Sequence, residues 1–172
     1  MAIIKANFIK NTARRSAGAK AHIRYIEHRR GKDGVKITRT LFGAYGQMSR
    51  QQAYEMIDQA EEGSTYFRLV ISPDPEREDT ARDLLLREIT AKTMDIEEKL
   101  GKPVSWVAAI HDDHTPKRHV HILAVVKERL LPVQAMRQAA TQSCVEQRRE
   151  LDLSRQQERE RKAQWELQRE GG

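Results

Sequence analysis

Residues 104–126 read VSWVAAIHDDHTPKRHVHILAVV, and this stretch decides the fold. Two β-type apolar runs, 104–110 and 119–126, lie on either side of the polar segment 112–118. Strands joined by a short polar segment pair most simply with each other, so the stretch predicts an antiparallel hairpin with a long loop.

Strand and helix patterns alternate between the start of the chain and this hairpin. Apolar and polar residues alternate over 2–9, which predicts a strand, and the period becomes that of a helix over 13–30. Gly31 ends this helix and begins a glycine-rich loop over 31–47, in which a short strand is expected over 35–41.

A second helix pattern and a second strand pattern follow. Ser49 and Gln52 form a capping-box pattern that begins a helix, and Gly63 ends it. The period returns to two over 66–72, and a further helix is expected over about 79–101.

The chain becomes helical again after Pro132, and charged residues dominate from Glu146 onward. We therefore predict an α/β domain of the α+β kind, with a central, mainly antiparallel sheet covered by helices, over residues 1–130. Residues 131–172 are expected to form a charged helical extension or connector. The helical pattern stops abruptly at Gly172, which indicates either a frayed tail or, as we expect, a chain truncated from a longer protein.

The composition excludes several classes of protein. Cys144 is the single cysteine and cannot form an internal disulfide, so a disulfide-framed fold is excluded. No apolar run approaches the roughly 18 residues of a membrane span. We expect a cytoplasmic protein without membrane insertion.

Positive charge is concentrated in the first third of the chain. Residues 1–50 contain 12 Lys and Arg against 2 Asp and Glu, whereas the whole chain has a net charge of +6. A segment this basic commonly faces a polyanion, and nucleic acid is the first candidate. The alternative is a basic surface that contacts only solvent.

Three histidines of the predicted hairpin form a candidate metal site. Residues two apart on a strand share a face, so His119 and His121 point to the same side of the sheet. A register that pairs His111 with His119 brings the third imidazole to the same place. Asp113 is the predicted acceptor of the second ring proton of one of these imidazoles. The alternative is that these are surface histidines in a polar loop, or buried histidines whose ring nitrogens bond to the backbone.

Two neighbouring residues leave alternatives open. Asp112 or His114 can replace Asp113 as that acceptor. His114 as a fourth ligand would close the coordination shell, which suits structural zinc and leaves no position for a substrate.

Three motifs resemble those of conjugative relaxases, the DNA-nicking branch of the HUH endonucleases. The run from 111 to 121, HDDHTPKRHVH, resembles their third motif, although the interval between its first and second ligand histidines is longer than in some relatives. Ser72, in RLVISPD, resembles the strand-end serine of the second motif, which contacts DNA near the cleavage site. Tyr25, in AHIRYIEHR, resembles the N-terminal tyrosine of the first motif. The resemblance covers residues 20–126.

The resemblance implies a metal-dependent endonuclease that nicks one DNA strand at a transfer origin. The oxygen of Tyr25 would attack a phosphodiester, giving a covalent 5′-phosphotyrosyl enzyme and a free 3′-hydroxyl, and reversal would rejoin the strand. The ion held by the three histidines would neutralise charge on the phosphate and on the leaving oxygen. We expect Mn²⁺ or Mg²⁺ in the working enzyme and consider zinc a candidate in purified protein, because imidazoles favour it.

The tyrosines are not equal candidates for the nucleophile. Tyr25 lies beside His22 on the predicted helix and away from its apolar stripe. Tyr45, in a glycine-flanked loop, is the main rival, and His22 is a minor one because a minority of relaxases are thought to attack with histidine. Tyr54 and Tyr66 lie within regular elements and are expected to be packing residues.

The resemblance also suggests partners. Single-stranded DNA is expected to contact Arg24, Arg29, Arg30, Arg68, Ser72 and Lys117. In a bacterial cytoplasm, accessory DNA-binding proteins of the relaxosome and a secretion coupling protein would act on the same plasmid or integrative element.

Two alternative functions remain. A rolling-circle replication initiator is the first, although its tyrosine usually follows the histidine pair, whereas every tyrosine here precedes His119. The second is a non-catalytic DNA-binding module in which the histidines hold structural zinc.

Overall fold

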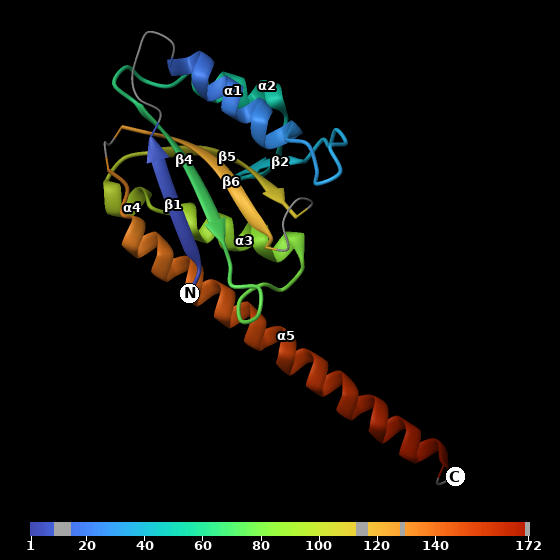
Figure 1. The fold of residues 1–172 in the computed structure, drawn as a ribbon. Coiled ribbons are helices and arrows are strands. Elements are labelled where there is room, and N and C mark those ends of the chain that lie inside the picture. The colour runs from blue at the N-terminus through green and yellow to red at the C-terminus, as the bar shows by residue number, and fades with distance from the viewer. Residues whose placement is uncertain (9–14, 113–116, 128–129, 171–172) are drawn as a thin grey trace.

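A computed structural model describes residues 1–8, 15–112, 117–127 and 130–170 (Figure 1). Within these ranges one antiparallel sheet has the strand order β1-β4-β6-β5-β2-β3. Its strands are β1 (Ile3–Phe8), β2 (Leu41–Gly43), β3 (Gly46–Met48), β4 (Thr65–Ser72), β5 (Val104–His111) and β6 (His119–Val126). The predicted antiparallel hairpin is the β5–β6 pair.

Helices pack on both faces of this sheet. They are α1 (Arg15–His28), α2 (Arg50–Asp58), α3 (Asp83–Met94), α4 (Glu97–Leu100) and α5 (Val133–Glu170). Figure 1 shows α1 and α2 on one face and α3 and α5 on the other. The predicted fold class, an α+β domain with an antiparallel sheet covered by helices and followed by a charged C-terminal helix, is confirmed.

Alternation along the central strands places the histidines on the face that α1 covers. Ala109 of β5 and Leu123 of β6 are fully buried with Ile23 of α1 in one apolar cluster. Since side chains two apart share a face, His111 and His121 continue the same two rows toward the end of the hairpin. The core under α1 therefore ends where the histidines begin.

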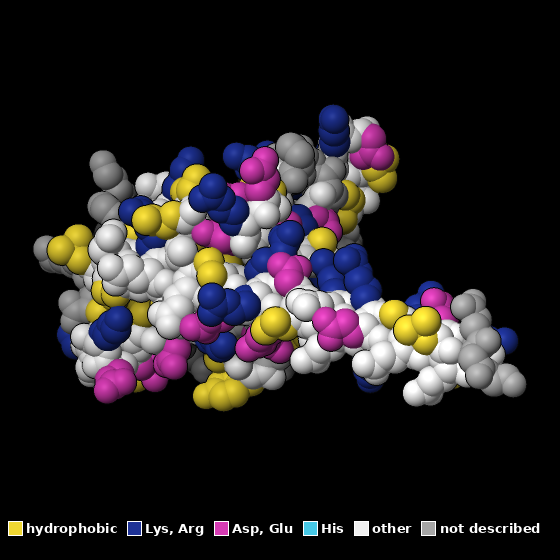
Figure 2. All heavy atoms as spheres, turned by 90° about the horizontal axis from the view of Figure 1, so that it is seen from below, with side chains coloured by type: hydrophobic (Ala, Val, Ile, Leu, Met, Phe, Trp, Pro, Cys, Tyr) yellow, Lys and Arg dark blue, Asp and Glu magenta, His cyan; other side chains and the backbone are white. Residues whose placement is uncertain are grey.

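The other face of the sheet forms a second core. Trp106 and Ile122 pack there with Leu86 of α3 and Met136 of α5. This core includes the first part of α5, whereas every described side chain after Leu151 is exposed. Figures 1 and 2 show the second half of α5 protruding from the rest of the molecule, with charged and apolar side chains scattered along it.

Two predicted elements are wrong in position. The strand expected over 35–41 is absent, and the hairpin of β2 and β3 forms just after it. Residues before this hairpin bond to α1 instead of a neighbouring strand: the amide of Arg39 donates to the carbonyl of Glu27 at 2.9 Å. Because the amide of Arg39 is bonded to α1, it cannot also bond to a neighbouring strand of the sheet.

The helix expected over 79–101 is shorter and broken. Ala81 has φ 55°, a left-handed conformation that cannot continue a helix, and α3 begins only at Asp83. A second break after Met94 separates α3 from α4. The capping box at Ser49 is confirmed, because Ser49 and Gln52 bond reciprocally, but α2 ends at Asp58 rather than at Gly63.

Among the described residues, none of the helices has the length and apolar content needed to cross a bilayer.

Candidate metal centre and active site

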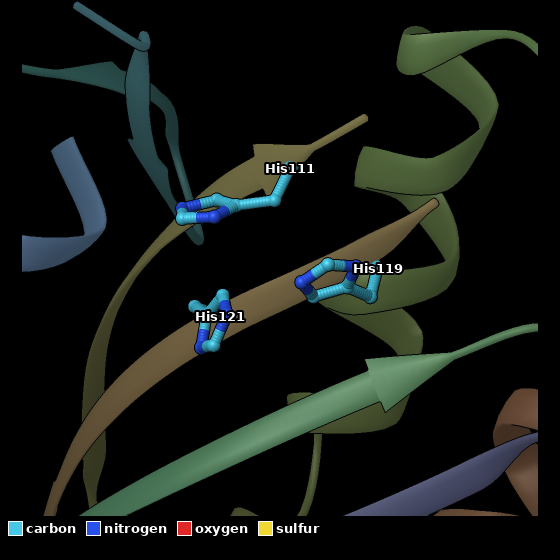
Figure 3. Close-up of side chains that lie close together, drawn as sticks. All are labelled: His111, His119 and His121. Carbon is cyan, nitrogen blue, oxygen red and sulfur yellow. The ribbon is translucent and has the colours of Figure 1, made fainter. Parts of the chain in front are cut away.

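The β5–β6 register brings the three predicted ligands together. His111 pairs with His119, and His121 lies two residues further along β6 on the same face. One nitrogen from each imidazole lies within 4.8 Å of the other two. Figure 3 shows the rings gathered on one side of the hairpin. This group can hold a metal ion, as the spacing predicted.

Backbone carbonyls orient two of the imidazoles. His111 is fully buried, and its Nε2 donates to the carbonyl oxygen of Ile26 in α1 at 2.7 Å. Nδ1 of His119 donates to the carbonyl oxygen of Lys117 at 2.9 Å. These bonds place the lone pairs on Nδ1 of His111 and Nε2 of His119, which is how proteins usually present a histidine to a metal.

The third imidazole is held neutral. Burial, followed by the nearby imidazoles of His111 and His119, lowers the pKa of His121 to about 3. A neutral ring is the form that binds a metal ion. Its Nε2 is buried and has no hydrogen-bond partner among the described residues, so an ion would satisfy an otherwise costly buried atom.

Asp113, the predicted acceptor, and His114, one of its alternatives, lie outside the described residues. The backbone carbonyls of Ile26 and Lys117 accept the ring protons of His111 and His119, which is the role that was predicted for the carboxylate of Asp113. Asp112 is exposed and contributes to a separate cavity of about 150 Å³ on the far side of β5.

Helix α1 places Tyr25 against this group. The Tyr25 ring meets the ring of His121 edge to face, with centroids 6.0 Å apart. His22, one helical turn earlier, stacks on it at 5.8 Å, and the Arg29 guanidinium lies over it at 5.5 Å. Because Tyr25 is 43% exposed, a substrate can reach it.

His22 is partly buried beside the tyrosine and is also neutral. Burial, and then the positive charge of Arg68, lowers the pKa of His22 to about 4. Its Nε2 has no hydrogen-bond partner in the described part of the chain. His22 therefore supports the Tyr25 ring without adding positive charge to the site.

The other tyrosines lie elsewhere. Tyr45 is fully exposed in the β2–β3 turn and lines a cavity with Trp106, whose side chain belongs to the core on the opposite face of the sheet. The hydroxyl of Tyr54 accepts a bond from Arg24 at 3.0 Å, and Tyr66 is buried in the core under α1. Among the four tyrosines, Tyr25 is the one with a ring contact to the histidine group.

The predicted DNA contacts are arranged unevenly around the site. Arg68 is exposed on β4 and shares the face of His121, and Ser72 lies level with His119, one step beyond the pair Ile71 and Val120. Lys117 is exposed next to the hairpin. Arg29 covers the Tyr25 ring, Arg24 bonds to Tyr54, and Arg30 donates to the carbonyl of Gly34.

Comparison with known families, curated proteins and solved structures found no match to this chain. The function must therefore be argued from the residues themselves.

Two features of the site have no signal in the sequence. One is the carbonyl of Ile26, because a backbone acceptor 85 residues from His111 leaves no trace in residue identity. The other is Arg118, which lies directly before the candidate ligand His119 and forms ion pairs with Asp79 and Asp83.

Proposed function

We propose that this chain is a metal-dependent enzyme that nicks single-stranded DNA with Tyr25 as the nucleophile. The observation that carries the proposal is the edge-to-face contact between Tyr25 and His121, which joins an accessible phenol to a group of imidazoles suited to a metal ion. A phosphodiester that reached the metal would also reach the hydroxyl.

The proposed reaction is a transesterification. The Oη atom of Tyr25 loses its proton and attacks phosphorus, the bond from phosphorus to the 3′ oxygen breaks, and that oxygen takes up a proton to become the free 3′-hydroxyl. A divalent ion at the histidines supplies charge neutralisation at a non-bridging phosphate oxygen. His22 and Arg29 hold the phenol ring, and the guanidinium adds positive charge over that ring. One phosphate ester bond forms for each one that breaks, so no bond energy is lost to hydrolysis and the step is reversible.

The open part of the sheet beside the site suits a single strand. On the face shared with the histidines, Lys5 and Asn7 of β1 and Arg68 of β4 are exposed, and the apolar side chain of Ile3 is half exposed. Basic groups can follow the phosphates of a single strand, and Ile3 adds an apolar surface beside them.

The biological setting follows the resemblance and belongs to the same proposal. As a relaxase, the enzyme would act at the transfer origin of a plasmid or integrative element, with relaxosome proteins and a secretion coupling protein as partners. Mn²⁺ or Mg²⁺ would serve as the metal.

Covalent capture tests the proposed function. The protein is incubated with Mn²⁺ and a pool of single-stranded oligonucleotides of random sequence, labelled at the 3′ end so that the captured fragment keeps its label. A labelled protein band that survives denaturation is the expected result. A reaction that yields only free fragments, or no cleavage of any sequence in the pool, contradicts the proposal.

Salt dependence tests the electrostatic part of the interface. Affinity for a single strand should fall linearly on a log–log plot against salt, with a slope of about −0.7 for each phosphate contacted. Arg68→Gln should make the slope less negative by about 0.7, since it removes one contact. Arg155→Gln, on the protruding part of α5, is the matched control and should leave the slope unchanged. Fluorescence anisotropy at several salt concentrations measures both, and a flat wild-type plot would refute this part.

A further inference from the structure

Arg118 joins the start of β6 to the opposite side of the sheet. Its guanidinium lies 3.3 Å from a carboxylate oxygen of Asp79 and also forms an ion pair with Asp83, at the beginning of α3. The side chains of Arg118 and Asp79 are only 12% and 14% exposed, so this contact is better shielded than an ordinary surface ion pair.

Arg118 lies in the chain between the two residues that determine the orientation of the His119 imidazole. It lies between Lys117, whose carbonyl accepts the ring proton of His119, and His119 itself. The side chain of Arg118 therefore fixes the short backbone segment that supplies both the imidazole and the acceptor that orients it. Movement of this segment would move the ligand and its acceptor together.

The acid side of the contact is itself held in place. The carboxylate of Asp79 accepts a hydrogen bond from the backbone amide of Ala81 at 2.9 Å. In this turn Ala81 has an unfavourable φ of 55°. Arg148 of α5 donates to the carbonyl of Asp79 at 2.7 Å. The turn at Asp79 and Ala81 is therefore fixed by α5 through Arg148, and it gives Arg118 a rigid partner.

We infer that Arg118 is a positioning residue for the metal centre. Through its ion pairs with Asp79 and Asp83, Arg118 holds His119 in the geometry that binds the ion. The inference rests on the metal site of the proposed function and goes beyond it, because Arg118 touches neither the ion nor the substrate.

Metal affinity of the whole chain tests this inference. Arg118→Met keeps an unbranched side chain of about the length of the aliphatic part of arginine and removes both ion pairs, and it should weaken Co²⁺ binding about tenfold, as loss of groups that orient ligands typically does. The visible absorption of bound Co²⁺ reports both the affinity and the symmetry of the site. Arg118→Lys keeps the charge and should recover part of the affinity, and Asp83→Asn should weaken binding in the same direction.

The opposite end of the same strand provides a matched control. Lys127 follows β6 as Arg118 precedes it, and it forms an ion pair with Glu61 far from the histidines. Lys127→Met should leave Co²⁺ affinity and spectrum unchanged. Thermal unfolding without metal is measured for both variants, and Arg118→Met is expected to be the less stable because it leaves the shielded carboxylate of Asp79 without its partner.

Each outcome separates this inference from the proposed function. If Arg118→Met binds Co²⁺ as tightly as the wild type, or only unfolds at a lower temperature, Arg118 is merely structural and the inference is wrong. If Arg118→Met does not fold, unchanged affinity in Arg118→Lys and Asp83→Asn overturns the inference equally. A wild-type protein that binds no Co²⁺ overturns the metal centre itself, whereas normal metal binding without DNA capture overturns only the nicking function.

Discussion

The Tyr25→Phe variant is expected to form no covalent adduct with single-stranded DNA. Phenylalanine keeps the ring that meets His121 and stacks on His22, and it removes only the oxygen that would attack phosphorus. Folding and metal affinity should therefore match the wild type, while the labelled protein band falls to background. Denaturing electrophoresis after reaction with a 3′-labelled strand and Mn²⁺ measures the loss.

The same substitution at other tyrosines is the control. Tyr45→Phe tests the main rival, which is exposed but lines a cavity of the other core, and Tyr54→Phe removes a hydroxyl that bonds to Arg24. Both should retain full capture. A complete adduct yield from Tyr25→Phe would reassign the nucleophile, and loss of the adduct in Tyr45→Phe alone would assign it to that residue.

Removal of the metal is expected to stop cleavage without unfolding the chain. Two apolar cores, one on each face of the sheet, hold the helices and strands independently of the histidines. Chelation should therefore abolish nicking and leave the far-ultraviolet circular dichroism unchanged, and added Mn²⁺ should restore activity. A tightly bound ion would raise the free energy of unfolding by about 2.7 kcal/mol at a concentration one hundred times its dissociation constant.

A structural zinc site would behave differently. In that alternative the binding free energy of the metal is needed for folding, so a chelator unfolds the protein. His121→Ala separates the two cases, because it removes one ligand without a chelator. A folded, inactive variant agrees with a catalytic metal. Unfolding on chelation, with DNA binding that survives in Tyr25→Phe, would favour the DNA-binding module.

The hairpin could be predicted from the sequence because each of its strands is a long apolar run and a polar segment separates the two. Alternation fixes the face of every side chain, so once His111 pairs with His119 the position of His121 follows. The capping box at Ser49 was equally predictable, since it depends on two residues three apart.

The errors lie where tertiary contacts override the local pattern. The sequence around Ala81 is compatible with a helix, yet Asp79 bonds to the amide of Ala81 and to Arg118, and a turn results. Neither Arg118 nor Arg148, which holds that turn, is near it in the chain. Their effect on the start of α3 cannot be found in the local pattern.

The candidate site divides in the same way. Its imidazoles come from one hairpin and were predictable from spacing. The approach of Tyr25 to His121 depends on how α1 packs across the sheet, and residue spacing carries no information about it. The bond from His111 to the carbonyl of Ile26 has the same origin, and it ties the helix that carries Tyr25 to a ligand histidine.

Anomalous diffraction at the manganese absorption edge, from crystals grown with Mn²⁺, locates the ion in the protein. We expect one anomalous peak within coordination distance of a nitrogen of each of His111, His119 and His121, with an open coordination position on the side of the Tyr25 hydroxyl. A peak elsewhere, histidine rings that point apart, or a shell closed by a fourth protein ligand would contradict it.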